Sequence, residues 1–248
     1  MYIWQDRALF LGDRSVTDVH GHHALEISIA LDDLGVHVGC PGGGEVRGGA
    51  AVMVRPDAPH RLHIPGPKVA VLYVEPHSPL GRGLQERMGD ASLLEVSSAS
   101  ARPTFLGLFD EATGLGEAEA AISALLAPLA PEPHHPWLDW RVRRATEALA
   151  ERLADPPSQT ALAQELGLSA SRLGHLFSAQ VGVPMRRYVL WLRLRAALTE
   201  ALATGSMTDA ALAAGFSDAA HFSRTCRRMF GLAPTAFAPV DDVFVATA

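Results

Sequence analysis

Four side chains in the first quarter of the sequence have the chemistry of a metal or ligand site. His20, His22 and Glu26 are close together in the chain, and His60 follows later. In an extended strand, His20, His22 and Glu26 have the same parity and therefore lie on one face. Imidazole and carboxylate groups together are a credible ligand set for a divalent transition metal. Three interpretations are open: a metal site, a metal-free ligand pocket that uses some of these residues, or side chains that only pack in the interior.

The surrounding residues predict the β-structure that would position these side chains. Short apolar runs are separated by Gly, Pro and Asp, which is typical of an all-β sandwich or barrel. Leu25, Ile27 and Ile29 alternate with more polar neighbours, which predicts a half-buried strand. The Gly-rich residues 40–44 predict a flexible loop. The predicted strands are 8–12, 15–20, 24–31, 34–40, 51–54, 60–64 and 68–75.

Residues 79–130 change to helical spacing. Residues 117–129 predict a helix with one apolar stripe, formed by Ile122, Leu125, Leu126 and Leu129. Such a stripe packs on its own domain or forms a dimer face, and the sequence leaves both open. Residues 131–136 hold three prolines, which predicts an extended linker.

Residues 208–230 predict a helix-turn-helix. Gly215 lies where the chain must turn, because Gly takes positive φ without penalty. Ser217 is predicted to cap the following helix, and Gly231 with Pro234 ends it. That helix places apolar side chains on an inner face, while a polar, basic outer face suits a helix that enters a DNA groove. The outer face holds His221, Arg224, Thr225 and Arg228.

Residues 158–180 repeat the same design. Ser158 and Ser169 are N-cap candidates, and Gly167 makes the turn between two helices. The predicted outer face of the second helix holds Ser171, Arg172, Gly174, His175 and Ser178. The two motifs are joined by a predicted helix over 184–203, which at 1.5 Å per residue is roughly 30 Å long. That length suits two recognition helices about one turn of B-DNA apart.

Composition and charge narrow the class of protein. The 248 residues carry a net charge of −6, with 9 Lys/Arg against 17 Asp/Glu in residues 1–135 and 12 against 8 in residues 136–240. A basic second part beside an acidic first part makes nucleic acid a candidate partner. No apolar run is long enough to span a membrane, and the first residues lack signal-peptide features. With only Cys40 and Cys226, we expect a cytoplasmic protein without a disulfide framework.

Residues 158–238 resemble the DNA-binding domain of AraC/XylS-family bacterial transcription regulators. The resemblance rests on the segments 162–177, 182–198 and 214–237, which have the sequences LAQELGLSASRLGHLF, GVPMRRYVLWLRLRAAL and AGFSDAAHFSRTCRRMFGLAPTAF. Likewise, HGHHALE over 20–26 and PDAPH over 56–60 resemble the two halves of the cupin signature. The resemblance implies an α+β chain: a cupin-like sensor barrel over 1–78, the helical segment and linker, then an all-α DNA-binding domain over 137–240 with two helix-turn-helix motifs, and a tail over 241–248.

The family resemblance also implies roles for residues. Arg172 and Arg228 are implied to contact phosphate, whereas Arg193 has a position that points to a structural role. Arg224 is the strongest candidate for base reading, because Arg can bond guanine bidentately. The implied base or phosphate contacts of the two recognition helices are Ser171, Gly174, His175, Ser178, Ala220, His221, Arg224 and Thr225.

The implied function is a regulator that binds double-stranded promoter or operator DNA and responds to an effector at His20, His22, Glu26 and His60. RNA polymerase and a second copy of the chain are implied partners, a membrane is not, and the only implied cofactor is a divalent metal in the cupin. The alternative is a metal-dependent cupin enzyme, a dioxygenase or isomerase, with an accessory helical domain. The duplicated helix-turn-helix favours the regulator, so we do not expect catalysis.

Overall fold

A computed structural model of the chain describes residues 1–12, 15–41, 44–99, 101–111, 114–129, 138–237 and 243–246. The chain divides into two compact units, Met1–His134 with Arg227–Ala248, and His135–Cys226. The boundary at Cys226 falls inside helix α9 (Ala219–Phe230), whereas the sequence placed all of 137–240 in one domain. The predicted linker, 131–136, lies outside the described residues.

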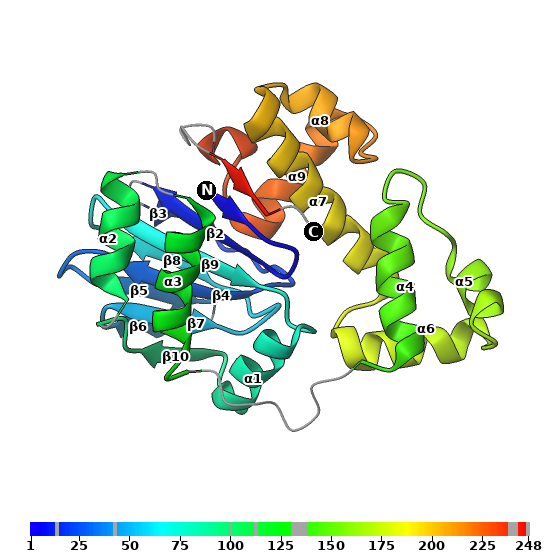
Figure 1. Ribbon diagram of the computed structural model, residues 1–248, viewed down its shortest axis with the longest axis horizontal. Helices are drawn as coiled ribbons and strands as arrows, with labels where there is room; N and C mark the ends of the chain where they lie inside the picture. The colour runs from blue at the N-terminus through cyan, green and yellow to red at the C-terminus, as the bar shows by residue number, and fades with distance from the viewer. Residues whose placement is uncertain are drawn as a thin grey trace. The chain divides into compact units, whose positions relative to one another are not determined.

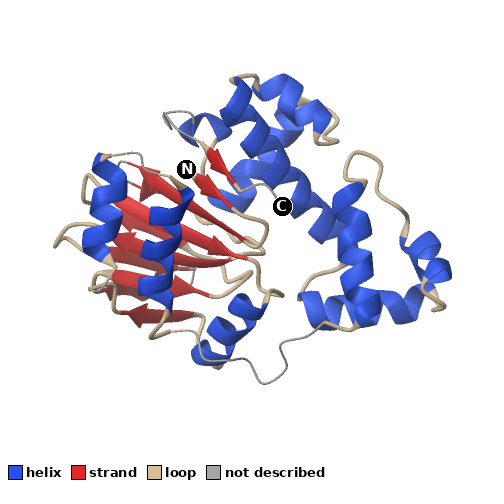
Figure 2. Ribbon diagram, in the orientation of Figure 1, coloured by secondary structure: helices blue, strands red, loops and turns tan. Residues whose placement is uncertain are grey.

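The first unit is built on two β-sheets (Figures 1 and 2). The larger sheet has the strand order β10-β7-β4-β9-β2-β1-β11, and the smaller has β3-β8-β5-β6. Most pairs are antiparallel, as expected for short strands joined by tight turns. The strands are β1 (Tyr2–Ile3), β2 (Arg7–Gly12), β3 (Ser15–Val16), β4 (Leu25–Ala30), β5 (Val36–Cys40), β6 (Gly44–Gly48), β7 (Ala51–Val54), β8 (Arg61–Ile64), β9 (Val69–Val74), β10 (Leu93–Val96) and β11 (Phe244–Val245).

Strand β4 is buried on both faces, not on one as the sequence predicted. Leu25, Ile27 and Ile29 belong to the core between the larger sheet and the helices. On the opposite face, Ala30 belongs to a second apolar core, and Glu26 and Ser28 are buried with it. The polar residues of this alternation therefore mark a polar centre inside the protein, where the sequence pattern suggested a solvated face.

Three helices contribute side chains to the core on one face of the larger sheet: α1 (Pro79–Met88), α2 (Arg102–Asp110) and α3 (Leu115–Leu126). Helices α2 and α3 lie side by side across it (Figure 1). The predicted apolar stripe from Ile122 to Leu129 is buried in the core beneath them. The stripe thus packs on its own unit and is not available as a dimer face. Strand β10 interrupts the segment that the sequence predicted as helical.

The predicted tail contributes to the sheet instead. Strand β11 pairs in parallel with β1, with Phe244 opposite Tyr2, and their rings stack 4.9 Å apart. A short 3₁₀ helix, η1 (Pro234–Phe237), precedes it and buries Phe237. The reason is that Phe244 and Val245 form an apolar pair that can complete an otherwise open sheet edge. Residues 238–242 and 247–248 lie outside the described residues.

The second unit is helical. Its central helix α7 is twenty residues long and packs against α8 at its C-terminal end. Smaller contacts join α7 to α4 and α6. These two helices pack near one end of α7, and α8 packs near the other (Figure 1). The helices are α4 (Trp140–Glu151), α5 (Gln159–Glu165), α6 (Ala170–Val181), α7 (Met185–Thr204) and α8 (Met207–Ala213), followed by α9.

Serine side chains cap the N-termini of three of these helices, α5, α6 and α8. Ser158 accepts a hydrogen bond from Ala161 N, and Ser169 accepts one from Arg172 N, as the sequence predicted. At α9 the prediction was wrong by one residue: Asp218, not Ser217, caps the helix by accepting from His221 N at 2.6 Å. The carboxylate reaches the backbone amide directly, while Ser217 donates to Asp218.

Two further observations concern membrane-spanning helices and cysteines. In the described part of the chain, no helix is long and apolar enough to cross a membrane. Cys40 and Cys226 are not joined by a disulfide. Cys226 is fully buried, as expected for a small apolar core residue.

Gly81 is required by close packing, which gives a first prediction. A Cβ at Gly81 would lie 2.1 Å from the Glu75 carbonyl oxygen and 2.8 Å from Pro76 Cα. Because these are backbone atoms, Gly81→Ala should lower the free energy of unfolding by about 1–3 kcal/mol. Gly107→Ala is the control, since that helical glycine has nothing within 4 Å, and it should gain up to about 1 kcal/mol. Urea unfolding measures both, and equal effects would contradict the packing account.

Candidate effector site and nucleic-acid interface

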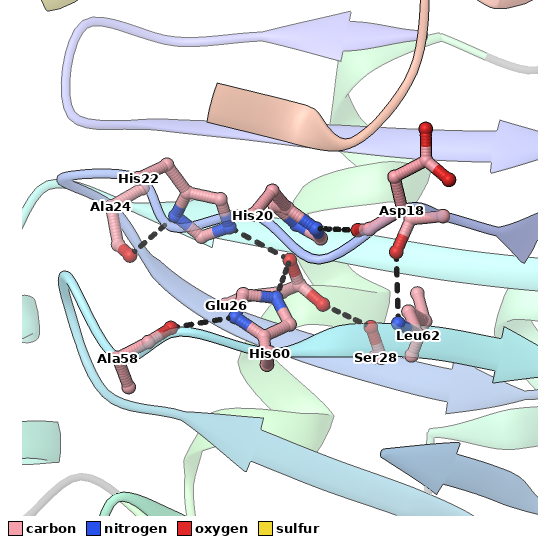
Figure 3. A network of polar contacts seen from close by, with 10 residues as sticks. Asp18, His20, His22, Ala24, Glu26, Ser28, Ala58, His60 and Leu62 are labelled. Carbon is pink, nitrogen blue, oxygen red and sulfur yellow. Dashed lines mark hydrogen bonds and ion pairs between the residues drawn. The ribbon is translucent and has the colours of Figure 1, made fainter. Parts of the chain in front are cut away.

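His20, His22, Glu26 and His60 converge inside the first unit (Figure 3). One ligand atom from each lies within 4.8 Å of the others, and all four residues are buried. Glu26 is on β4, but His20 and His22 precede that strand and do not share it. An isolated antiparallel bridge supplies the convergence: His20 and His60 exchange both backbone hydrogen bonds, at 2.8 and 2.9 Å. The four residues therefore meet as predicted, by a bridge in place of strand parity.

Each of the three imidazoles is oriented by a backbone carbonyl. The Nδ1 atoms of His20, His22 and His60 lie 2.8, 2.9 and 2.8 Å from the carbonyl oxygens of Asp18, Ala24 and Ala58. A carbonyl oxygen can only accept, so each Nδ1 carries a proton, an assignment made from the hydrogen-bond network. The Nε2 atoms of His22 and His60 consequently face Glu26 (Figure 3).

Glu26 is the charged centre of this site. Its Oε2 lies 2.9 Å from His22 Nε2 and 3.5 Å from His60 Nε2, and its Oε1 accepts from Ser28 Oγ at 2.6 Å. Burial by itself raises the pKa of Glu26, but the hydrogen bonds from His22 and His60 outweigh it and hold that pKa well below its ordinary value. Glu26 is therefore a carboxylate in a buried site.

The pKa values of His20 and His60 are shifted in opposite directions. Burial, helped by the neighbouring His60, lowers the pKa of His20 to about 4. Burial also acts to lower the pKa of His60, but its contact with Glu26 outweighs this and raises that pKa. His20 is thus a neutral imidazole at ordinary pH. The contact with Glu26 instead favours the protonated, positively charged form of His60.

Aromatic side chains enclose the site, and the sequence did not identify them. The Tyr73 ring lies 5.3 Å from His22, and the Phe230 ring lies 5.9 Å from it. Phe230 also contacts Tyr73 and Phe237, at 5.4 and 5.6 Å. Ser28 could have been found from its i+2 spacing to Glu26, but nothing local in the sequence connects residue 230 to residue 22.

Gly231 approaches the same site through its backbone. Its carbonyl oxygen accepts from Asp18 N at 3.1 Å. A Cβ there would lie 2.5 Å from the Asp18 carbonyl oxygen and 2.8 Å from His20 Nδ1, and φ is +66°. Glycine is therefore required at this position for both space and conformation. The end of α9 and the histidine cluster around Glu26 are held together within the first unit.

The donor set fits a divalent transition metal. Histidine ligands of metals characteristically donate their second ring N–H to a carbonyl or carboxylate, and all three histidines here do so. Three imidazole nitrogens and one carboxylate oxygen match the coordination of zinc and its neighbours. The same geometry also suits a small effector with polar groups, because a buried carboxylate and histidines can exchange hydrogen bonds with it.

The outer face of α6 is exposed as predicted. Ser171, Arg172 and His175 are exposed, and Gly174 and Ser178 are partly exposed. Gly174 has a packing role: a Cβ would lie 2.5 Å from Gln159 Nε2, which donates to the Ala170 carbonyl at 2.7 Å. The glycine thus makes room for a contact between α5 and α6.

The outer face of α9 is smaller than predicted. Ala220 and Arg224 are exposed, Arg228 is exposed, and His221 is partly exposed. Thr225 was assigned to this face wrongly, since it is only 2% exposed. Its position explains the error: Thr225 is three residues after Phe222 and four before Met229, so it lies on the buried stripe.

Arg193 has the structural position that the family resemblance implied. Its Nε donates to the Leu153 carbonyl at 3.2 Å, and its Nη2 donates to the Ala154 carbonyl at 3.1 Å. The guanidinium also fills the space beside Gly215. Arg193 therefore connects the segment after α4 to the turn before α9.

Gly215 gives a second prediction. Its φ is +87°, and a Cβ would lie 2.9 Å from three atoms of the Arg193 guanidinium. Gly205 is the matched control, with φ of +77° and nothing within 4 Å. Gly205→Ala should cost about 1–2 kcal/mol of conformational strain. Gly215→Ala should cost roughly a further 1 kcal/mol, because Arg193 must also move. Thermal unfolding of both variants measures the difference, and equal shifts would contradict the role of Arg193.

Part of this chain is similar in sequence to known proteins. Residues 162–238 match the family described as "Helix-turn-helix domain". The arabinose operon regulatory protein of Salmonella typhimurium is 32% identical over 154 residues, which cover 55% of this chain and 53% of that protein. The chain spans about half the length of the curated relatives it matches.

Solved structures extend the likeness in fold. ToxT from Vibrio cholerae matches with a TM-score of 0.59 at 10% identity, over 94% of this chain and 98% of that one. A structure of wild-type ToxT from strain SCE256, described as bound to unsaturated fatty acid, matches at 0.58 and 12% identity, over 94% and 95%. At such identities the likeness concerns the fold: a sheet-based N-terminal part and a helical C-terminal part. Together the matches confirm the predicted resemblance to the AraC/XylS family.

Proposed function

We propose that this chain is a sequence-specific DNA-binding transcription regulator that responds to a ligand in its N-terminal part. One observation carries the proposal: two helix pairs, α5 with α6 and α8 with α9, lie within or next to the helix-turn-helix family match. Each pair has a glycine turn, and its second helix has an exposed polar face. This duplication favours a regulator over a cupin enzyme, because an enzyme would have no use for it.

The spacing of the two pairs supports a shared DNA site. Helix α7 has 20 residues and is therefore roughly 30 Å long. Successive major grooves on one side of B-DNA are about 34 Å apart. We infer that α6 and α9 act as two recognition helices in adjacent grooves, with α9 supplying more of the base reading through His221 and Arg224.

We further propose that the first unit is a cupin-like sensor whose effector binds at His20, His22, Glu26 and His60. A divalent metal at this site would supply a Lewis-acidic anchor for an effector with oxygen donors. The protein's own contribution is orientation, because each imidazole is fixed by a carbonyl and Glu26 by Ser28. In the metal-free alternative, the same side chains bind the effector by hydrogen bonds. ToxT is described with an unsaturated fatty acid, which supports a small-molecule role for this type of fold.

Coupling between effector and DNA is supported by the end of α9. Phe230 contacts His22, and the Gly231 carbonyl accepts from Asp18, which also orients His20. A ligand that moves these histidines must therefore also act on the last turn of α9. Such a contact provides differential affinity between two arrangements, which is what a ligand-driven shift requires.

Two partners complete the proposal. A second copy of the chain would bind two-fold sites, but it would dock elsewhere than on the apolar stripe of α3, which is buried. RNA polymerase is the partner through which a promoter-bound regulator acts.

Arg224→Ala tests base reading by α9. We expect a loss of about 1–3 kcal/mol of discrimination at one base pair, because a bidentate Arg–guanine contact is removed. Arg228→Ala should weaken binding to all sequences and reduce the salt slope by about 1, as for a phosphate contact. Fluorescence anisotropy measures both, with DNA selected by the purified chain from a random library.

The control is Arg144→Ala, which removes the same charge from α4, where Arg144 pairs with Glu147 and Glu151. Its affinity should change by no more than about twofold, because exposed charges away from DNA are screened. Unchanged affinity and base preference in Arg224→Ala would refute the assignment.

Metal analysis of the purified chain tests the effector site. If the site holds a metal, His22→Ala should lose it, because one of four ligands and its carbonyl-fixed orientation are removed. In wild type, Zn²⁺ should then also change the affinity for the selected DNA, and in His22→Ala it should not. His63→Ala is the control, since that exposed side chain lies on β8 opposite His37. A metal content that His22→Ala leaves intact would assign the metal elsewhere and leave the metal-free pocket.

A further inference from the structure

A second group of ligand-type side chains lies in the first unit and is used by neither the DNA-binding helices nor the Glu26 site. His23, Glu75 and His77 bring one ligand atom each to within 4.8 Å of the others. Glu75 Oε2 and His77 Nδ1 are 3.8 Å apart, and the rings of His23 and His77 stack at 6.3 Å. The sequence predicted no role for these three residues, and His77 lies outside the two cupin-like motifs.

Strand register explains why the three meet. In the antiparallel pair β4 and β9, Leu25 is opposite Val74. Continuing that register by one residue brings the chain before β4, which carries His23, beside the chain after β9, which carries Glu75. His77 follows in the same turn. His22 and His23 are consecutive in the chain, and His22 belongs to the Glu26 site while His23 belongs to the second group.

The turn that carries Glu75 and His77 is rigid. Glu75 N donates to the Asp6 carbonyl at 2.8 Å, and the Glu75 carbonyl accepts from both N and Oγ of Ser78, at 3.1 and 2.8 Å. The Pro76 carbonyl accepts from Gln85 Nε2 at 2.8 Å. The His77 carbonyl accepts from Arg82 Nε at 3.2 Å. These contacts fix the backbone from which two of the three ligands project.

Burial makes this set more than a surface cluster. His23 is 2% exposed, and the Glu75 and His77 side chains are 5% and 14% exposed. A buried carboxylate between two imidazoles is costly unless it is compensated by positive charge or hydrogen bonds. A divalent cation bound here would place positive charge beside Glu75, and the partial exposure of the His77 side chain leaves a route by which it can enter.

We propose that His23, Glu75 and His77 form a second metal site, for Zn²⁺ or a neighbouring divalent transition metal. Two imidazoles and one carboxylate are a known zinc ligand set that leaves a coordination position open for water or another ligand. At metal–ligand distances of about 2.1 Å, tetrahedral ligands lie roughly 3.4 Å apart, so the 3.8 Å between Glu75 and His77 needs only a small contraction. The metal would clip the start of β4 to the turn between β9 and α1.

Zn²⁺ titration of the full-length protein, stripped by a chelator, tests this proposal. Calorimetry and elemental analysis would compare His22→Ala with the double variant His22→Ala/His77→Ala, so that the Glu26 site is impaired in both. We expect His22→Ala to bind one equivalent of Zn²⁺ and the double variant to bind it about 100-fold more weakly, because one of three ligands is lost. No DNA enters this measurement, so its outcome is independent of the proposed function.

Glu75→Gln in the His22→Ala background is the second variant, since it keeps the shape of the side chain and should weaken Zn²⁺ similarly. His63→Ala in the same background is the control, and it should leave Zn²⁺ binding unchanged. Circular dichroism of each metal-free variant checks the fold. If His22→Ala binds Zn²⁺ no more tightly than its His77→Ala and Glu75→Gln derivatives, the second site does not exist.

Discussion

The buried Glu26 carboxylate is the interaction on which the first unit depends. A carboxylate removed from water costs several kcal/mol unless hydrogen bonds and positive charge compensate. His22, Ser28 and His60 supply this compensation, and the bridge between His20 and His60 holds two of the strand connections in place. An apolar residue at position 26 would avoid this desolvation cost, and the proposed metal or effector would bind to the charge that Glu26 carries there.

The Glu26 site also explains why the boundary between the two units falls inside helix α9 and not at the end of the predicted helix-turn-helix motif. Phe230 and Gly231 end helix α9, yet they contact His22 and Asp18 and belong to the first unit. Strand β11 then returns the chain to β1. The segment that follows α9 therefore belongs structurally to the first unit, and under the proposed function a ligand at the Glu26 site would act on the last turn of that helix.

Local chemistry made much of this predictable. The serine caps, the glycine turns and the length of α7 follow from residue preferences within a few positions, and they were correct to within a residue or two. The four residues of the Glu26 site were found through the resemblance of 20–26 and 56–60 to the two halves of the cupin signature. Long-range packing was not predictable: the burial of both faces of β4, the strand from residues 244–245, and the cover supplied by Phe230 all depend on contacts between distant residues. The prediction that Thr225 lies on the outer face of α9 was wrong, because it did not follow the buried helical stripe through Phe222 and Met229.

Hydroxyl-radical footprinting of the full chain on its selected DNA tests the central claim most directly. Two recognition helices joined by α7 should protect two short patches about one helical turn, roughly 10 base pairs, apart on the same side of the duplex. Arg224→Ala should weaken only the patch bound by α9. A single protected patch, or protection that is equal on unrelated DNA, would contradict the account of two groove-reading helices.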